Sequence, residues 1–210
     1  MLRVLIADDH EIVRRGLRDL LTTRLGNVEV SEAKDAGDTI NLLITRNWDL
    51  VLLDISMPGR SGLEVLEEAK RLRPKLPVLV LTSYTEEQFA LRSFKLGASG
   101  YITKQCVSDE LITAVQRVLA GGKYVTAALA ERLASCLGDR CHEAPHEALS
   151  HREFQVLRLI ALGKSMKETA EELALSEKTV AAYRTRITEK TGLRTKVEIA
   201  RYALKRGLVE

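Results

Sequence analysis

The first half of the sequence alternates five times between a short apolar segment and a longer segment whose apolar residues have helical spacing. The short segments are bounded by polar residues, as is typical of strands that are buried on both faces. We expect strands over residues 2–7, 28–33, 50–53, 77–82 and 100–103. We expect helices over residues 11–25, 36–46, 62–72, 86–96 and 108–120. The alternation predicts a doubly wound α/β fold, with five parallel strands in one sheet and helices on both of its faces.

Polar side chains follow the carboxyl ends of several of these strands. The residues concerned are Asp8 and Asp9, Asp54, Thr82 and Lys104. In an open parallel sheet, these strand ends border the crevice in which ligands bind. Carboxylates that converge there repel one another unless a cation lies between them. Oxygen ligands that leave room for water suit Mg²⁺.

A magnesium ion, an ammonium group and a hydroxyl group together could neutralise a bound phosphoryl group. Asp54 would then be the nucleophile, and it would form an aspartyl phosphate. Each residue could instead have a structural role; for example, Asp8 or Asp9 could cap the first helix. Haloacid-dehalogenase-like phosphatases also use an aspartate at a strand end. They need a second aspartate two positions further on, where this chain has Ser56.

The last third of the chain carries the excess of positive charge. Residues 150–210 hold 13 Lys and Arg against 8 Asp and Glu, whereas residues 1–121 hold 16 against 17. This part is expected to be all-α, with four helices. Three of them have the start signal of a capping box, namely Ser150 with Glu153, Ser165 with Glu168 and Thr195 with Glu198. Two helices joined by a short turn at 174–176, the second of them basic, are typical of a DNA-binding helix-turn-helix.

The second helix of this pair would be capped by Ser176. Val180, Tyr183 and Ile187 recur at helical spacing and should pack inward. A solvated charged face is the alternative to a DNA-binding surface. Nine Lys and Arg against three Asp and Glu between residues 176 and 206 favour nucleic acid. The candidate contacts are Lys178, Thr179, Ala181, Ala182, Arg184, Thr185, Arg186, Lys190, Arg194 and Lys196.

The residues between these two parts show weaker periodicity. We divide the chain into residues 1–121, a linker of residues 122–147 with a short helix near 126–134, and residues 148–210. The linker contains Cys136, Cys141, His142 and His146. Adjacent Cys141 and His142 do not fit the ligand spacing of a zinc knuckle, so we expect no zinc. No apolar run is long enough to span a membrane, and no secretory signal is recognisable, so we expect a cytoplasmic protein without a membrane partner.

Residues 1–121 resemble the receiver domain of two-component response regulators, which has a flavodoxin-like fold. The residues that carry this resemblance are Asp8, Asp9, Asp54 within the segment 54–59, Thr82, Tyr101 and Lys104. The resemblance implies that Asp54 is the phosphoacceptor. It also implies a set of Mg²⁺ ligands, namely Asp8, Asp9, Asp54 and the carbonyl of Ser56. Thr82 and Lys104 would contact the phosphoryl oxygens, and Tyr101 would swing inward on activation.

Residues 148–210 resemble the LuxR-type helix-turn-helix, so the whole chain is similar to the NarL/FixJ family of response regulators. The segments that carry this resemblance are 149–153, 159–161, 163–165, 167–168, 170 and 176–180. The family often has a lysine at position 181 and a histidine at position 183, where this chain has Ala181 and Tyr183. Its base preference therefore does not follow from the resemblance.

The resemblance implies a bacterial transcription factor controlled by phosphorylation, and not an enzyme. A sensor histidine kinase would phosphorylate Asp54, and the protein would bind double-stranded DNA as a homodimer. RNA polymerase is a further candidate partner. One alternative is a DNA-binding protein with an inert receiver, against which the intact acidic residues argue. The other is a receiver that signals only through protein contacts, against which the basic C-terminal third argues.

Overall fold

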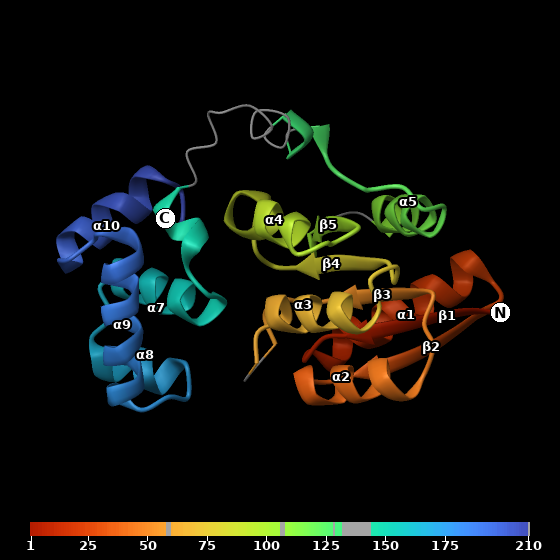
Figure 1. Ribbon diagram of the computed structural model, residues 1–210, viewed down its shortest axis with the longest axis horizontal. Coiled ribbons are helices and arrows are strands. Elements are labelled where there is room, and N and C mark those ends of the chain that lie inside the picture. Colours follow the sequence, from red (N-terminus) through yellow and green to blue (C-terminus); the bar gives the residue numbers. More distant parts are fainter. Residues whose placement is uncertain (58–59, 106–107, 128, 132–143, 210) are drawn as a thin grey trace. The chain divides into compact units, whose positions relative to one another are not determined.

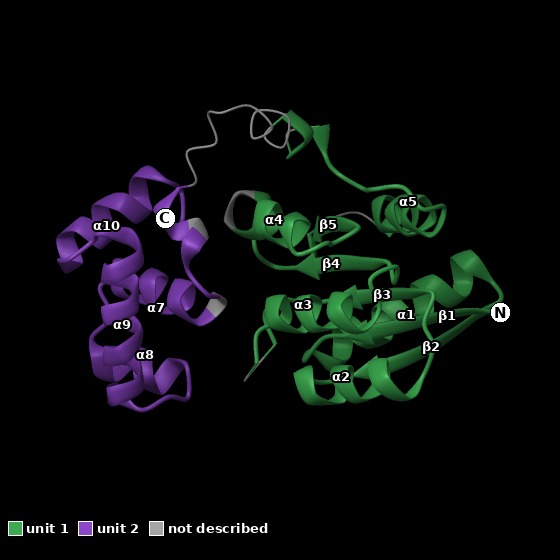
Figure 2. Cartoon of the chain, in the orientation of Figure 1, with its two compact units in different colours: residues 1–141 green, residues 142–210 purple. Residues whose placement is uncertain are grey.

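The computed structural model describes residues 1–57, 60–105, 108–127, 129–131 and 144–209. They belong to two compact units, residues 1–141 and residues 142–210 (Figure 2). Cys136, Cys141 and His142, which were considered as zinc ligands, lie outside the described residues. Within the described residues, no helix is both long enough and apolar enough to cross a lipid bilayer.

The first unit contains a parallel sheet with the strand order β2-β1-β3-β4-β5, which confirms the predicted fold class. The strands are β1 (Leu2–Ala7), β2 (Val28–Ala33), β3 (Leu50–Leu53), β4 (Val78–Thr82) and β5 (Gly100–Thr103). The helices are α1 (Glu11–Leu25), α2 (Ala36–Thr45), α3 (Gly62–Leu72), α4 (Glu86–Lys95) and α5 (Ser108–Leu119). Helix α1 contacts α5, and α2 contacts α3, so helices cover both faces of the sheet (Figure 1).

The strands differ in burial according to their place in the sheet. All residues of the central strand β3 and of its neighbour β4 are buried, because helices cover them on both faces. Strand β2 lies at one edge, and only its last residue, Ala33, is buried. At the other edge, Gly100 of β5 forms a parallel bridge with Tyr124.

The segment that begins at Gly122 packs against the first unit over the residues that the structure describes. The backbone N–H of Tyr124 donates to the carbonyl of Ser99 at 2.9 Å. The Thr126 hydroxyl donates to the Glu86 carboxylate at 2.6 Å, at the start of α4. Leu129 is buried. The first part of the predicted linker is therefore held on the receiver-like unit at the edge of the sheet.

The second unit consists of helices. They are the short 3-10 helix η1 (Pro145–Ala148) and the α-helices α7 (His151–Ala161), α8 (Met166–Glu172), α9 (Glu177–Thr191) and α10 (Lys196–Lys205). The three predicted capping boxes, which begin α7, α8 and α10, are all present. Helix α9 packs against α7 and α8, and Gly192 ends it in the left-handed conformation with φ of 74°. His146 is buried in this unit, with its Nδ1 at 2.7 Å from the Tyr202 hydroxyl.

Candidate metal centre and nucleic-acid interface

Asp8 and Asp54 leave the sheet side by side. They directly follow β1 and β3, which are paired, and Ala7 and Leu53 form the last pair of that register. The backbone N–H of Asp54 donates to the carbonyl of Ala7 at 2.8 Å, and both carboxylates are buried. The predicted convergence of these two acids is thus a direct result of the parallel register.

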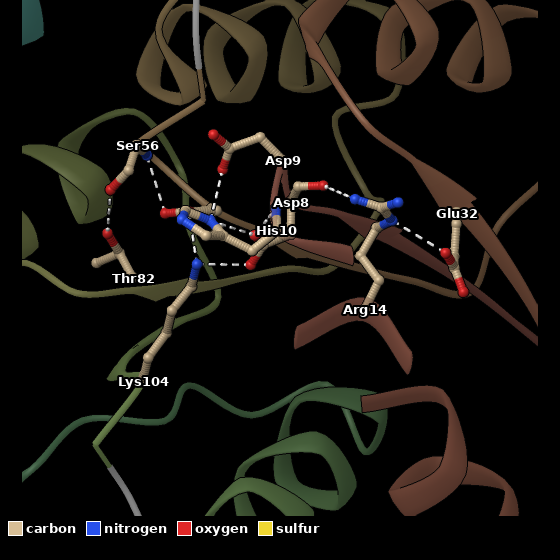
Figure 3. Close-up of polar contacts among 9 residues, drawn as sticks. Asp8, Asp9, His10, Arg14, Glu32, Ser56, Thr82 and Lys104 are labelled. Carbon is tan, nitrogen blue, oxygen red and sulfur yellow. Dashed lines mark hydrogen bonds and ion pairs between the residues drawn. The ribbon is translucent and has the colours of Figure 1, made fainter. Parts of the chain in front are cut away.

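Lys104 links the two buried carboxylates. Its ammonium is 2.7 Å from Asp54 Oδ2 and 2.6 Å from Asp8 Oδ2 (Figure 3). Burial would lower the pKa of Lys104, but the hydrogen bonds and negative charges of Asp54 and Asp8 outweigh burial, and the net pKa is raised. Lys104 is therefore a permanent cation at neutral pH.

Asp9 and His10 lie next to these two carboxylates and complete the cluster. The Asp9 side chain is 28% exposed, and its Oδ1 is 2.8 Å from Nδ1 of His10. The His10 backbone N–H donates to Asp8 Oδ1 at 2.9 Å. One ligand atom each from Asp8, Asp9, His10 and Asp54 lie within 4.8 Å of one another. Four groups so close together could surround a single ion.

The donor set fits a hard divalent cation. Three carboxylates are balanced here by the single ammonium of Lys104, which binds two of them, so the three acids and the lysine together carry two net negative charges. Carboxylate oxygens are the ligands that Mg²⁺ prefers, usually together with several waters. The acidic cluster formed by Asp8, Asp9 and Asp54 is therefore compatible with Mg²⁺ binding.

Ser56 and Thr82 lie on the other side of Asp54. The Ser56 backbone N–H donates to Asp54 Oδ1 at 2.9 Å, and the hydroxyls of Ser56 and Thr82 are 3.3 Å apart (Figure 3). Helix α3 begins very close to this loop, because a Cβ at Gly62 would lie 2.1 Å from the Asp54 carbonyl oxygen. Only glycine permits this approach of α3 to the backbone of Asp54 and Ile55, the two residues before Ser56.

Tyr101 is fully buried in β5. Its hydroxyl lies 3.0 Å from the carbonyl oxygen of Tyr84 and 3.2 Å from that of Thr85, both in the loop after β4. The ring is therefore buried, and its hydroxyl bonds to backbone carbonyls. The structure has Tyr101 in the inward position, bound to the loop that follows Thr82.

Sequence reasoning missed Arg14 and Glu32. The Arg14 guanidinium donates to the Asp8 carbonyl at 2.8 Å and to the Glu32 carboxylate at 2.9 Å (Figure 3). Glu32 lies in β2 beside Ile6 of β1. A pair of opposite charges 18 residues apart on a helix and an edge strand has no sequence signal, because it depends on how α1 crosses the sheet.

In the second unit, α8 and α9 form the predicted helix-turn-helix. Ala174, in the turn, has a positive φ of 52°, and the Leu175 N–H donates to the Ala170 carbonyl at 2.8 Å. Ser176 caps α9 by accepting from the Thr179 N–H at 3.1 Å. The short turn and the cap fix the direction in which α9 leaves α8.

The two faces of α9 differ in burial. Val180 and Ile187 are fully buried, as predicted, while Tyr183 is only half-buried and lies 5.8 Å from the Arg186 guanidinium. Of the candidate DNA contacts, Thr179 and Arg184 are half-buried. The exposed candidates are Lys178, Ala181, Ala182, Thr185, Arg186, Lys190, Arg194 and Lys196.

Lys190, one of the candidate DNA contacts, has an acidic partner for its ammonium. It lies 2.7 Å from the carboxylate of Glu153, which is buried at the start of α7. Burial would raise the pKa of Glu153, but Lys190 and the Ser150 N–H lower it by more, so the net pKa is below its ordinary value. Lys190 thus joins α9 to α7.

Both units match families of known proteins. Residues 4–116 match the family model of the response regulator receiver domain, and residues 147–203 match that of bacterial regulatory proteins of the luxR family. The response regulator GacA of Pseudomonas aeruginosa is 36% identical over 211 residues, which cover 100% of this chain and 99% of GacA. The response regulator UvrY of Escherichia coli is 35% identical over 209 residues, which cover 99% of this chain and 96% of UvrY.

Solved structures agree with these matches. RcsB from Salmonella enterica serovar Typhimurium, bound to promoter rprA in the presence of phosphomimetic BeF3-, has a TM-score of 0.63 at 28% sequence identity, over 96% of this chain and 98% of RcsB. The chain therefore belongs to the NarL/FixJ family of two-component response regulators, transcription regulators with a receiver domain and a LuxR-type DNA-binding domain.

Proposed function

We propose that Asp54 accepts a phosphoryl group from a sensor histidine kinase, and that phosphorylation promotes the binding of promoter DNA by a homodimer. The observation that carries this proposal is the environment of Asp54. It is a buried carboxylate at a strand end, with a lysine and a backbone N–H on its two oxygens and two further acids beside it. We place this reaction in the bacterial cytoplasm, where the protein acts as a regulator and not as an enzyme.

Phosphoryl transfer needs little covalent chemistry from the protein. A bond forms between a carboxylate oxygen of Asp54 and phosphorus, while the bond from phosphorus to the donor's leaving group breaks. Asp8, Asp9, Asp54 and the carbonyl of Ser56 would hold Mg²⁺, which would supply positive charge to the phosphoryl oxygens. On phosphorylation, the ammonium of Lys104 would shift from the unphosphorylated carboxylate of Asp54 to the phosphoryl oxygens. Zinc plays no part in this proposal.

Thr82 and Tyr101 would convert phosphorylation into a change of shape. The Thr82 hydroxyl is 3.3 Å from that of Ser56, and a phosphoryl group on Asp54 would offer it a charged acceptor instead. A shift of Thr82 would move the loop that follows it, which contains Tyr84 and Thr85. The Tyr101 hydroxyl binds the carbonyls of that loop. The inward position of the Tyr101 ring and the present conformation of the loop would therefore stabilise one another.

The DNA contacts would come from α9 and the start of α10. We propose that α9 faces the bases with residues that are exposed, unlike the buried Val180 and Ile187, namely Lys178, Ala181, Ala182, Thr185 and Arg186. Phosphates would be bound by the remaining candidates, namely Thr179, Arg184, Lys190, Arg194 and Lys196. Lys190 would bind a phosphate while it keeps its bond to Glu153.

Dimer formation would double the number of bases read. A solved structure of two RcsB dimers bound to two parallel DNAs matches 97% of this chain with a TM-score of 0.60, which supports a dimer here. RNA polymerase would be a further partner if the bound protein activates transcription.

The experiment begins with the selection of bound sequences from random DNA with phosphorylated protein. The affinity of the selected operator is then measured, at one salt concentration, for wild type with and without phosphorylation and for Asp54→Asn as the control. Because coupled sites differ in affinity by about 5- to 150-fold, we expect a difference in that range for wild type and none for Asp54→Asn. Equal affinities of the two wild-type forms would contradict the coupling, while leaving DNA binding itself intact.

A further inference from the structure

Arg14 connects the turn that carries two of the acids to the edge of the sheet. One guanidinium nitrogen donates to the Asp8 carbonyl at 2.8 Å, and Nε donates to Glu32 at 2.9 Å (Figure 3). The Arg14 and Glu32 side chains are only 12% and 19% exposed. An ion pair of this kind is more than a surface contact, because its charges are largely removed from water and each needs its partner.

Arg14 is not needed merely to neutralise Glu32. Arg18, one turn further along α1, also forms an ion pair with the Glu32 carboxylate, and its side chain is 47% exposed. Among the described side chains, Arg18 contributes no bond to Asp8. The feature that distinguishes Arg14 is therefore its second hydrogen bond. The planar guanidinium can bind a carboxylate and a carbonyl at the same time, in a fixed geometry.

Several of the other contacts of the turn from Asp8 to His10 act on its side chains: Lys104 binds the Asp8 carboxylate, and the His10 ring lies 2.8 Å from Asp9 Oδ1. The Asp8 N–H donates to the carbonyl of Ala33 at 3.1 Å, and Asp8 Oδ1 accepts from the His10 N–H. Within residues 8–14, all of which the structure describes, His10 forms no side-chain cap to α1. The helix start thus leaves this turn without the usual restraint, and Arg14 supplies one at the carbonyl of Asp8.

We propose that Arg14 is a positioning residue of the metal centre, which holds the Asp8–Asp9 turn so that both carboxylates face the ion. This inference rests on the proposed function, in which these acids bind Mg²⁺. Without Arg14, the turn would become ordered only when the ion binds. The affinity for Mg²⁺ would fall, because part of the binding free energy would be used to order the turn. Hydrogen-bond partners that orient metal ligands typically change affinity by about 10- to 100-fold.

Electrostatics alone predicts the opposite sign. Arg14 is a cation near the acidic cluster, so its removal would strengthen the binding of another cation if only charge mattered. Arg18 offers the matched control, since Arg14→Met and Arg18→Met each remove one positive charge and one partner of Glu32. Only Arg14→Met also removes the bond to the Asp8 carbonyl. The two variants therefore separate positioning from charge and from the stability of the ion pair.

The test is a calorimetric titration of Mg²⁺ into the unphosphorylated full-length protein, for wild type, Arg14→Met and Arg18→Met. We expect Arg14→Met to bind about 10-fold more weakly or worse, and Arg18→Met to stay within about 2-fold of wild type. Arg14→Lys is the second variant. It keeps the charge but cannot bridge both acceptors, so we expect weak binding again. Thermal unfolding without Mg²⁺ shows which variants are folded.

Phosphorylation kinetics give an independent readout. In Arg14→Met, the Mg²⁺ concentration at half-maximal rate should rise, while the rate at saturating Mg²⁺ stays close to wild type. Equal affinities of folded Arg14→Met, Arg14→Lys and wild type would overturn the positioning role, and so would an equal loss in Arg18→Met. A wild-type protein that binds no Mg²⁺ would instead contradict the metal centre itself, and with it both proposals.

Discussion

Lys104 and Asp54 are joined by a bond of 2.7 Å between two strands that are not neighbours. Asp54 follows β3 and Lys104 follows β5, and β4 lies between these strands in the sheet. The lysine also reaches Asp8 after β1, so one ammonium spans the carboxyl ends of strands across most of the sheet. This bridge balances part of the negative charge of the cluster. Its removal should therefore change both the free energy of unfolding and the affinity for Mg²⁺.

Lys104→Met should destabilise the first unit when Mg²⁺ is absent. Removing one partner of a buried ion pair leaves an uncompensated charge and costs up to about 3–5 kcal/mol. Added Mg²⁺ should restore more stability to the variant than to wild type. Denaturant unfolding can be followed by the fluorescence of Trp48, which is buried in this unit and is the only tryptophan of the chain.

Lys34→Met is the control for this experiment, because Lys34 is exposed. A surface substitution of this kind should change stability by no more than about 0.5 kcal/mol. If Lys104→Met and Lys34→Met unfold at the same denaturant concentration, the bridge does not stabilise the unit.

Thr82→Ala should uncouple phosphorylation from DNA binding, whereas Thr82→Ser should not. The hydroxyl is the group that we expect to move towards the phosphoryl oxygens, and serine keeps it. Both variants should still be phosphorylated. The ratio of operator affinities with and without phosphorylation is measured for each. A full ratio in Thr82→Ala would show that the hydroxyl does not carry the signal.

Acid should weaken the second unit through Glu153. Its pKa is below the ordinary value in the folded state, so the unfolded chain binds the proton more readily. The stabilisation is therefore complete above about pH 4.3, the pKa of a free glutamate, and is lost as the pH falls through the lower, folded pKa. Glu153→Gln should not show this dependence.

Hydrogen exchange of the α7 amides, corrected for the pH dependence of the intrinsic rate, measures this effect in the full chain. Lys190→Met should also reduce the protection of α7, because it removes the cation that stabilises the Glu153 carboxylate. Identical pH profiles for wild type and Glu153→Gln would remove Glu153 as the cause.

The two arginines near α9 should affect DNA binding in different ways. Arg186 is exposed on α9, so Arg186→Ala should cost about 1–3 kcal/mol on the preferred operator and reduce base preference. Arg194 precedes α10, and Arg194→Ala should weaken binding to all sequences and lower the salt slope by about 1. The affinities of both variants for the preferred operator and for unrelated DNA, measured over a series of salt concentrations, distinguish base contact from phosphate contact. Equal losses on both DNAs and equal salt slopes for the two variants would refute these roles.

The sheet and the acidic cluster could be predicted because both follow from local patterns. Strands such as β3 are continuous apolar runs, and a parallel sheet brings their carboxyl ends to one edge whatever the details of packing. Asp54 and Lys104 could therefore be placed together before their distance was known. The capping boxes were predictable for a similar reason, since they depend on residues only three positions apart.

Contacts that depend on the angle between packed elements could not be predicted. The sequence makes Lys190 a candidate DNA contact, whereas its bond to Glu153 depends on the packing of α9 on α7. The same holds for Arg14 and Glu32, which lie on a helix and an edge strand. Helical spacing predicts that Tyr183 packs inward, yet it is half-buried, with Arg186 near its ring. Helical spacing gives the face of a residue but not how far the neighbouring helix covers it.

The central claim is that Asp54 is the phosphoacceptor, and intact-mass spectrometry tests it most directly. The protein is incubated with Mg²⁺ and a small phosphodonor, and wild type is compared with Asp54→Asn. Asparagine keeps the size of the side chain, but its neutral amide cannot form the acyl phosphate. We predict that wild type gains the mass of a single phosphoryl group and that Asp54→Asn gains none. Equal labelling of the two proteins would contradict the account.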